Sequence, residues 1–379
     1  MPQMQDIQES QERLASSTVE FGRKLKFQKN NAFQVELQRR VDEFFLFTGR
    51  QKRDCPQMYV KTAILLLSFA LLYGLLVFKA QTWWQALPLS ILLGIVAAGI
   101  GFNIQHDGGH QAYSSIPWVN KLTGMTIALL GGSSYNWHWK HAVFHHMYVN
   151  IKAHDGDLDI GIFGRLTPHQ QWFPFHQWQH YYLWLLYGLM AIRWQLYDDF
   201  HNVLIGQIGE RPYPRPTGWE LFIFLMEKGI FFTLAFGIPL LFHSVWVVLI
   251  FYGVSAIVLG IILSVVFQLA HVVEEASFPL PLEDTGRIDN AWAIHQAETT
   301  VNFARYNPVV SWFVGGLNFQ VEHHLLPQIC HVNYPAISKL VEETCQEFGV
   351  QYNEHKSVWA GITSHGRWLW RMGMPNSIE

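Results

Sequence analysis

The sequence predicts an all-α integral membrane protein with four transmembrane helices in two hairpins, interfacial helices and a histidine-rich cap on the cytoplasmic side. Two observations predict this fold. Half of the 379 residues are hydrophobic and only 15% are charged, whereas an average soluble domain carries roughly 25% charged residues. The uncharged residues also gather in runs long enough to cross a bilayer, which takes about 20 apolar residues per helix. The net charge of −3 gives no basic surface of the kind that binds nucleic acid.

The first hairpin is predicted at about residues 62–79 and 84–104. Lys79 is the one charged residue left for its connecting loop, whereas ten basic residues lie between Arg23 and Lys61. Because positive charge marks the cytoplasmic side of a membrane protein, we expect the N-terminus and the end of the second span to lie in the cytoplasm. Residues 1–60 are then a cytoplasmic segment, and residues 61–379 form a single membrane domain.

The second hairpin is predicted at about residues 222–242 and 246–270, and it returns the C-terminus to the cytoplasm. The pattern of Thr217–Glu220 predicts a capping box at the start of its first helix. Glu227 and Lys228 lie inside that helix. Charged residues within a membrane span need a partner, a polar neighbour or an interfacial depth.

Two further apolar stretches are too short or too polar to span a bilayer. Leu122–Gly132 and Tyr181–Ile192 are therefore predicted to be interfacial or buried helices. Near the C-terminus, an amphipathic stretch with Pro335 close to its start and Gly349 past its end predicts a helix of the cap. The cap as a whole is expected from residues 105–221 and 271–379.

Eight of the 19 histidines lie in clusters at or beyond the cytoplasmic ends of the predicted spans. The clustered histidines are His106, His110, His141, His145, His146, His271, His323 and His324. They follow the spacings HxxxH, HxxxHH and QxxHH, with His271 ending the fourth span. Since the topology places all of them on one side of the membrane, they can form a single site. We interpret the lone histidines as ordinary solvated or core residues, namely His169, His176, His180, His201, His243, His355 and His365.

The composition of the clusters indicates a site for two metal ions. Histidine nitrogens bind iron, zinc, copper or nickel, and eight imidazoles exceed the four ligands of one zinc ion. The chain contains no Glu-x-x-His sequence, which argues against the carboxylate site of soluble di-iron bundles. Three cysteines without a C-x-x-C pair predict neither a disulfide framework nor a thiolate zinc site.

The position of the site at the ends of apolar spans indicates an apolar substrate. Two kinds of chemistry fit at this point. Zinc could hydrolyse an ester, and iron could activate dioxygen to remove hydrogen from an unactivated methylene, which no side chain can do alone.

The histidine motifs resemble those of the membrane fatty-acid desaturase family, and most closely those of its bacterial front-end branch, the Δ6-like acyl-lipid desaturases. The resemblance extends from about Lys24 to Gly373. Gln320 stands where the third motif of other members has its first histidine. In this feature the chain resembles the front-end desaturases, which also have glutamine there. The motifs that carry the resemblance lie at His106–His110, Trp139–Ile151, Phe267–His271 and Gly315–His324.

This resemblance implies a non-haem di-iron centre that inserts a cis double bond into an acyl chain with dioxygen and two electrons. By position, the eight clustered histidines correspond to the iron ligands, and no catalytic residue is expected beyond the ligands. Gln320 occupies a ninth ligand position and would either bind a metal weakly or only orient His323. The residues expected to accept hydrogen bonds from the metal-bound imidazoles are Asp107, Gln268, Asn318, His154 and Asp157.

The resemblance also implies the partners of the protein. The chain has no His-Pro-Gly-Gly haem motif and therefore no fused cytochrome b5 domain, so electrons would come from a separate ferredoxin or cytochrome b5. The substrate would be an acyl-lipid or an acyl-CoA. Five aromatic residues of the hairpins could wall its acyl chain, although packing or lipid contact explains them as well: Tyr73, Trp83, Phe231, Phe232 and Phe236.

Two alternative functions remain open. A lipid or alkane hydroxylase would use the same histidine motifs, because its reaction begins with the same hydrogen removal. A histidine-rich metal transporter is the more remote alternative, since transporter ligands should lie near the bilayer midplane and these histidines are predicted at helix ends.

Overall fold

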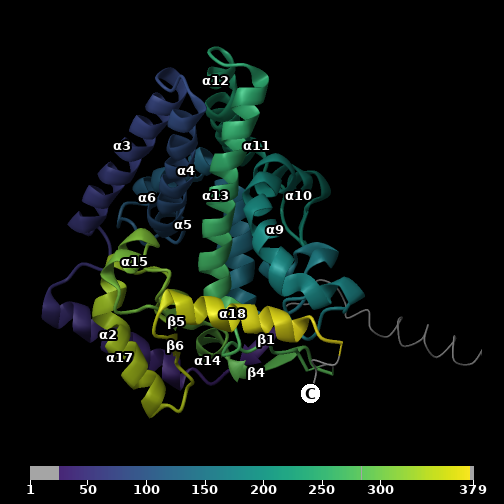
Figure 1. Ribbon diagram of the computed structural model, residues 1–379. Helices are drawn as coiled ribbons and strands as arrows, with labels where there is room; N and C mark the ends of the chain where they lie inside the picture. The colour runs from purple at the N-terminus through teal and green to yellow at the C-terminus, as the bar shows by residue number, and fades with distance from the viewer. Residues whose placement is uncertain (1–24, 283, 376–379) are drawn as a thin grey trace, which may run out of the picture.

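The computed structural model describes residues 25–282 and 284–375, and most of this part of the chain is helical. Four of its helices are long and apolar enough to cross a membrane, which confirms the predicted number of spans. Helix α4 packs against both α3 and α13, and the third span contacts α13 through its segments η8 and α12 (Figure 1). The four spans are Pro56–Phe78 (α3), Trp83–Gly109 (α4 with the segments η1 and α5), Gly218–Leu240 (α11 with η8 and α12) and Val245–His271 (α13).

The ends of the spans follow local sequence signals, with one exception. Helix α3 begins at Pro56 instead of 62, because proline suits the first turn of a helix. Thr82 and Gln85 form a capping box at the start of α4. The capping box predicted at Thr217 is wrong: this residue precedes α11 but makes no side-chain cap hydrogen bond. The next residue, Gly218, has a φ of +52°, so the first turn is not a regular right-handed helix.

The two charged residues inside the third span both have partners, as expected. Lys228 forms a buried ion pair of 2.7 Å with Asp199 and also donates to the carbonyl of Gly131 at 2.6 Å. Glu227 accepts a hydrogen bond of 3.0 Å from the backbone N–H of Ser134. These bonds connect α11 to the segments that lead into the second histidine motif.

The two shorter apolar stretches form helices that are not spans, as predicted. The first becomes α6 (Pro117–Gly124) and the 3₁₀ segment η2 (Met125–Leu130). The second becomes α9 (Gln179–Arg193), which packs along α13. A Cβ on Gly260 of α13 would lie 2.6 Å from the carbonyl oxygen of Gly188, so the glycine allows these two backbones to come close.

The cap lies beyond the ends of the spans and includes the predicted C-terminal helix. That helix is α17 (Tyr334–Glu347), with Pro335 in its first turn. It packs against α2 (Ala32–Thr48), whereas α18 (Val358–Met372) crosses below α13 (Figure 1). The short helices α14 (Trp292–Glu298) and α16 (Gln320–Leu325) pack against each other, and α14 also contacts α2 whereas α16 contacts α17.

The cap also contains short β-strands, which corrects the all-helical prediction in this detail. The described part of the chain has three two-stranded pairs, of which two join distant segments and one is a tight hairpin. Each strand has two to five residues, too short to show the alternating pattern that predicts a strand. The pairs are β1 (Lys26–Gln28) with β4 (Arg287–Ala291), β2 (Gln207–Ile208) with β3 (Arg211–Pro212), and β5 (Val301–Phe303) with β6 (Asn353–His355).

Several helices contain π-helical segments, in which a backbone N–H bonds the carbonyl five residues earlier. The segments are η1 (Gly101–Gln105), η3 (His138–His145), η7 (Trp194–Asp198) and η8 (Thr233–Gly237). The first leads directly into His106, and the second contains two clustered histidines. Single π-helical turns are often found at functional sites.

Candidate metal centre

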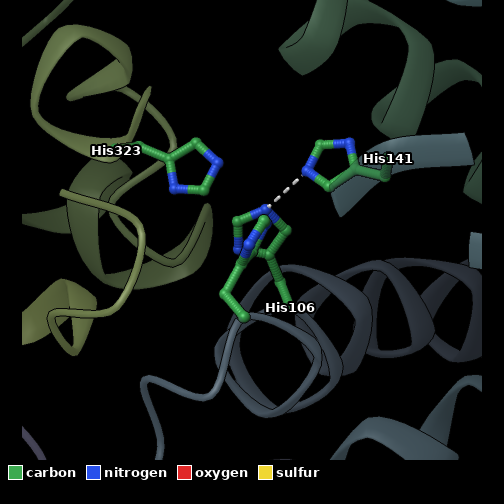
Figure 2. A group of neighbouring side chains, drawn as sticks. His106, His141 and His323 are labelled. Carbon is green, nitrogen blue, oxygen red and sulfur yellow. Dashed lines mark hydrogen bonds between the residues drawn. The ribbon is translucent and has the colours of Figure 1, made fainter. Parts of the chain in front are cut away.

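The structure brings all eight clustered histidines together where the second and fourth spans meet the cap. The imidazole centroids of His106 and His323 are 4.5 Å apart, and those of His146 and His324 are 4.3 Å apart. Figure 2 shows His106, His141 and His323 pointing toward one another from three separate segments. All eight are buried except His141, which is half-buried.

The first motif is placed by the continuous helix of the second span. His106 and His110 lie on one side of that helix, with ring centroids 4.6 Å apart, as the spacing predicts. The two glycines between them are required by close packing. A Cβ on Gly108 would overlap the hydroxyl of Thr123, and a Cβ on Gly109 would overlap the indole ring of Trp137.

The second motif depends on the π-helical segment η3. The backbone N–H of His146 bonds the carbonyl of His141, five residues earlier. This bond places His146 above His141, so that their Nε2 atoms are 3.3 Å apart. In an α-helix, side chains three and four residues apart share a face, so His146 would turn away from His141. The sequence does not reveal this change of helical geometry.

The remaining histidines come from the end of α13 and from α16. His271 is the last residue of α13, and its ring centroid lies 4.8 Å from that of His145. The turn before α16 uses the left-handed region at Gly315 and Gly316, with φ of +60° and +68°. A side chain on Gly315 would overlap the carbonyl of Phe102, so the turn fits against the second span only with glycine there.

The ligand atoms divide into two main sets, each within 4.8 Å. We call His106, His110, His141 and His323 the first histidine group, and His145, His271 and His324 the second histidine group. His146 is close to both groups, because its ring also neighbours His323 and His324. Seven or eight imidazoles in two adjoining sets fit two metal ions better than one.

The free nitrogen atoms indicate where metal ions fit. Among the described residues, the Nε2 atoms of five of these histidines are buried without a hydrogen-bond partner, as are Nδ1 of His146 and Oε1 of Gln320. Such buried, unpaired polar atoms are costly, and coordination of a metal ion would supply the missing partner. The five Nε2 atoms belong to His110, His145, His271, His323 and His324.

In the second histidine group, the opposite ring nitrogen of each imidazole is fixed by an acceptor. His145 Nδ1 is 3.1 Å from Asp155 Oδ2, and His324 Nδ1 is 2.9 Å from Gln296 Oε1. His271 Nδ1 is 3.3 Å from the carbonyl of Thr299. A donor hydrogen bond from Nδ1 sets the tautomer and leaves Nε2 free as a ligand.

Three of the five residues predicted to accept hydrogen bonds from metal-bound imidazoles bond other groups in the structure. Asp107 bonds Nδ1 of His331 at 2.9 Å, because neighbouring residues on a helix do not face the same side. Asn318 donates to the hydroxyl of Ser311 at 3.0 Å, seven residues earlier in the chain. His154 bonds the carbonyl of Lys152 and packs against Tyr148. These are the contacts that the structure shows for Asp107, Asn318 and His154, and their roles beside the metal-bound imidazoles stay predictions.

The other two predicted acceptors lie nearer the site. Asp157 Oδ2 is 3.6 Å from His145 Nδ1, and its other oxygen binds Lys140 at 2.9 Å. Gln268 is buried, and its Oε1 has no hydrogen-bond partner among the described residues. Sequence reasoning missed Asp155 and Gln296. Asp155 could have been found, since it stands two residues before Asp157 in the same loop, whereas Gln296 gave no signal beyond an amphipathic segment.

The electrostatic environment keeps most of these imidazoles neutral, as metal ligands must be. Burial and then the neighbouring imidazoles hold the pKa values of the clustered histidines outside the spans well below their ordinary value; these are His110, His141, His146, His323 and His324. His145 differs. Burial alone would lower its pKa, but the charge and hydrogen bond of Asp155 outweigh burial and raise the pKa.

Comparison with known proteins places this geometry in a family. Residues 81–356 match the family model described as fatty acid desaturase. The chain is 37% identical over 355 residues to the sn-1 linoleoyl-lipid 6-desaturase of Arthrospira platensis, covering 93% of this chain and 95% of that protein. It is 38% identical over 351 residues to the Synechocystis sp. enzyme of the same name, covering 92% and 98%. Identity to the acyl-lipid (8-3)-desaturase of Physcomitrium patens is 33% over 357 residues, covering 91% and 72%.

Proposed function

Because the chain belongs to the fatty acid desaturase family, we propose that its clustered histidines bind two iron ions and that this centre inserts a cis double bond into the acyl chain of a membrane lipid. The protein is an oxygen-dependent fatty-acyl desaturase. The observation that carries the iron site is the set of buried ring nitrogens that face one another without hydrogen-bond partners in the described structure.

The overall reaction fixes what the protein must bring together. A –CH₂–CH₂– unit, dioxygen, two electrons and two protons become –CH=CH– and two molecules of water. Bound iron supplies the activation of dioxygen and the removal of unactivated hydrogen, which no side chain can perform. The two electrons come from a separate protein, for which ferredoxin and cytochrome b5 are the candidates.

The residues of the chain hold and orient this centre. The first and second histidine groups would each hold one metal, and His146, whose ring neighbours His323 and His324, would be a further ligand. Asp155 and Gln296 keep Nδ1 of His145 and His324 occupied, so that Nε2 of both rings remains available. The surrounding buried side chains exclude water, and the half-buried His141 leaves one side accessible.

A cavity between the spans has a suitable place for the acyl chain. A cavity of about 320 Å³ extends from Thr82 and His243 at the outer helix ends to Ala97. Ala97 precedes His106 by nine residues on one continuous helix, or about 14 Å at 1.5 Å per residue. This cavity would receive the methyl-terminal part of the chain while an internal methylene lies beside the histidines. Of the five aromatic residues considered from the sequence, Tyr73, Trp83 and Phe231 line it.

The names of the relatives favour an acyl-lipid substrate and a front-end, Δ6-like double bond. Two of them are sn-1 linoleoyl-lipid 6-desaturases. The excess of basic residues before the first span favours a cytoplasmic active site with both termini on that side.

Product analysis tests the proposal and separates it from hydroxylation. The full-length chain is expressed in a host fed defined fatty acids, and the lipids are examined by mass spectrometry. Desaturation lowers the product mass by two units and places a new double bond near the carboxyl end, whereas a gain of sixteen units would show a hydroxylase. The purified protein is expected to contain iron. The variant His324→Ala serves as the inactive control.

A further inference from the structure

The turn Cys330–Tyr334, which follows the third histidine motif, contacts the neighbourhoods of two motifs. Nδ1 of His331 lies 2.9 Å from Asp107 Oδ2, and the backbone N–H of His331 donates to the same oxygen at 3.3 Å. Three residues later, the hydroxyl of Tyr334 lies 3.4 Å from Nδ1 of His323. One short turn thus reaches the first motif through Asp107 and the third motif through His323.

This turn is attached to the first span by Lys61. Lys61 is only 4% exposed, and its Nζ lies 3.0 Å from Nε2 of His331 and 5.1 Å from the ring centre of Trp312. An ammonium group can only donate hydrogen bonds, so Nε2 of His331 accepts and Nδ1 carries the hydrogen that is donated to Asp107. Lys61, His331 and Asp107 therefore form a continuous buried chain of charge-assisted hydrogen bonds.

The position of Asp107 gives this chain its effect on the site. Asp107 stands next to His106 and three residues before His110, in the last turn of the second span. Fixing the Asp107 carboxylate therefore fixes the rotation of the turn that carries both histidines. Gly316 makes room for the arrangement, since a Cβ there would lie 2.9 Å from Cβ of His331 and 3.0 Å from Cδ2 of Tyr334.

We propose that Lys61, His331 and Tyr334 are positioning residues for the first histidine group, acting on His106 and His110 through Asp107 and on His323 directly. The inference rests on the proposed function, because it takes the first histidine group to be a metal site. None of the three residues touches the reacting atoms. A buried ion pair adds little to stability, because the cost of desolvation offsets its Coulomb attraction. We therefore assign the chain Lys61–His331–Asp107 an effect on the geometry of the site and not on the stability of the fold.

The test measures metal affinity in Lys61→Met and His331→Phe, using the full-length protein and cobalt(II) with a competing chelator. Loss of a partner behind a metal ligand typically weakens metal binding by about 10- to 100-fold. We expect that loss at one of two metal equivalents, together with a changed cobalt absorption spectrum, while the other equivalent is unaffected. Lys61→Arg keeps the charge and the donor and should restore most of the affinity.

Lys228→Met is the matched control. Lys228 is also a buried lysine of a span, 3% exposed, and neither of its partners, Asp199 and the carbonyl of Gly131, bonds a clustered histidine in the described structure. This variant should lower the melting temperature but leave both metal affinities unchanged. Tyr334→Phe removes one hydroxyl and keeps the ring, so it tests the contact with His323 even if the Lys61 variant does not fold.

The outcomes separate this inference from the proposed function. Wild-type affinity for both metals in His331→Phe and Tyr334→Phe would overturn it, and so would an equal loss of metal in Lys228→Met. If the wild-type protein bound no metal at these histidines, the proposed function itself would fail first.

Discussion

The two histidine groups are held in different ways. Each ring of the second group is fixed from behind by an acceptor, from Asp155, Gln296 or the carbonyl of Thr299. In the first group, three rings pack against one another and against the indole of Trp137, and His141 is half-buried. Direct hydrogen bonds orient a ligand before the metal arrives. The second group is thus preformed, whereas the geometry of the first depends on packing and on the turn at His331.

The largest effect is expected from removing a ligand of either group. Replacing His106, His145, His271 or His324 with alanine should abolish desaturation and lower the bound iron, because no nearby side chain can substitute for the lost nitrogen. Lipid analysis and metal analysis of the same preparations check this. His201→Ala is the control, since His201 packs only on Tyr197 among the ring contacts of the described residues. Retained unsaturation in a variant would remove that histidine from the ligand set.

The variant Asp155→Asn tests whether the acceptor behind His145 fixes the second histidine group. Asp155 accepts hydrogen bonds from His145 and from the backbone N–H groups of Asn150 and Asp157. The amide keeps the size but loses the charge, so we expect metal affinity and activity to fall by about 10- to 100-fold. The loss should fall on the metal of the second group.

Chelator competition measures this loss of affinity. Asp159→Asn is the control for Asp155→Asn, because Asp159 is exposed and, among the described residues, its side chain accepts a hydrogen bond only from the N–H of Gly161. If Asp155→Asn bound both metals as tightly as the wild type, the second group would not owe its geometry to this carboxylate.

The sequence predicted the spans and the histidines well, for a physical reason. The bilayer thickness fixes the length of an apolar run, so four long apolar runs, only the third of them interrupted by charge, were visible without any tertiary information. The clustered histidines were visible because they gather at several helix ends, and the structure confirms that they converge, whereas their role as metal ligands stays a prediction. The fold of the cap was less predictable, because strands such as β5 pair with a segment about fifty residues away, at β6.

The support behind the ligands was the least predictable part. Asp155, Gln296 and Tyr334 act through contacts between segments that only the folded chain brings together. Asp107 was expected to serve a metal-bound imidazole because it stands beside His106, yet its side chain leaves the helix in another direction. Proximity in sequence therefore did not identify the partner.

A smaller effect is expected from Gly109→Ala, which disturbs the packing of the first group. The new methyl group would overlap the ring of Trp137, and overpacking of this kind costs about 1–3 kcal/mol. The melting temperature should fall, and the cobalt spectrum should change at the first group only. In the double variant with Trp137→Phe, the smaller ring should relieve part of the loss, giving a favourable coupling energy. Strictly additive losses would show that the two residues do not press on one another.

The smallest effect is expected at Gln320, which shares α16 with His323 and His324. It is 3% exposed, and its Oε1 has no hydrogen-bond partner in the described structure. A neutral amide oxygen is a weaker ligand for iron than an imidazole. Loss of the hydrogen-bond partner of a metal-bound histidine typically costs at least roughly 10-fold in activity, and we expect Gln320→Ala to cost less than that. Gln320→His offers a nitrogen at the same place, and activity that survives in it would favour a ligand position. Unchanged activity in Gln320→Ala would instead show that Gln320 neither binds metal nor orients His323, leaving the two groups to the histidines alone.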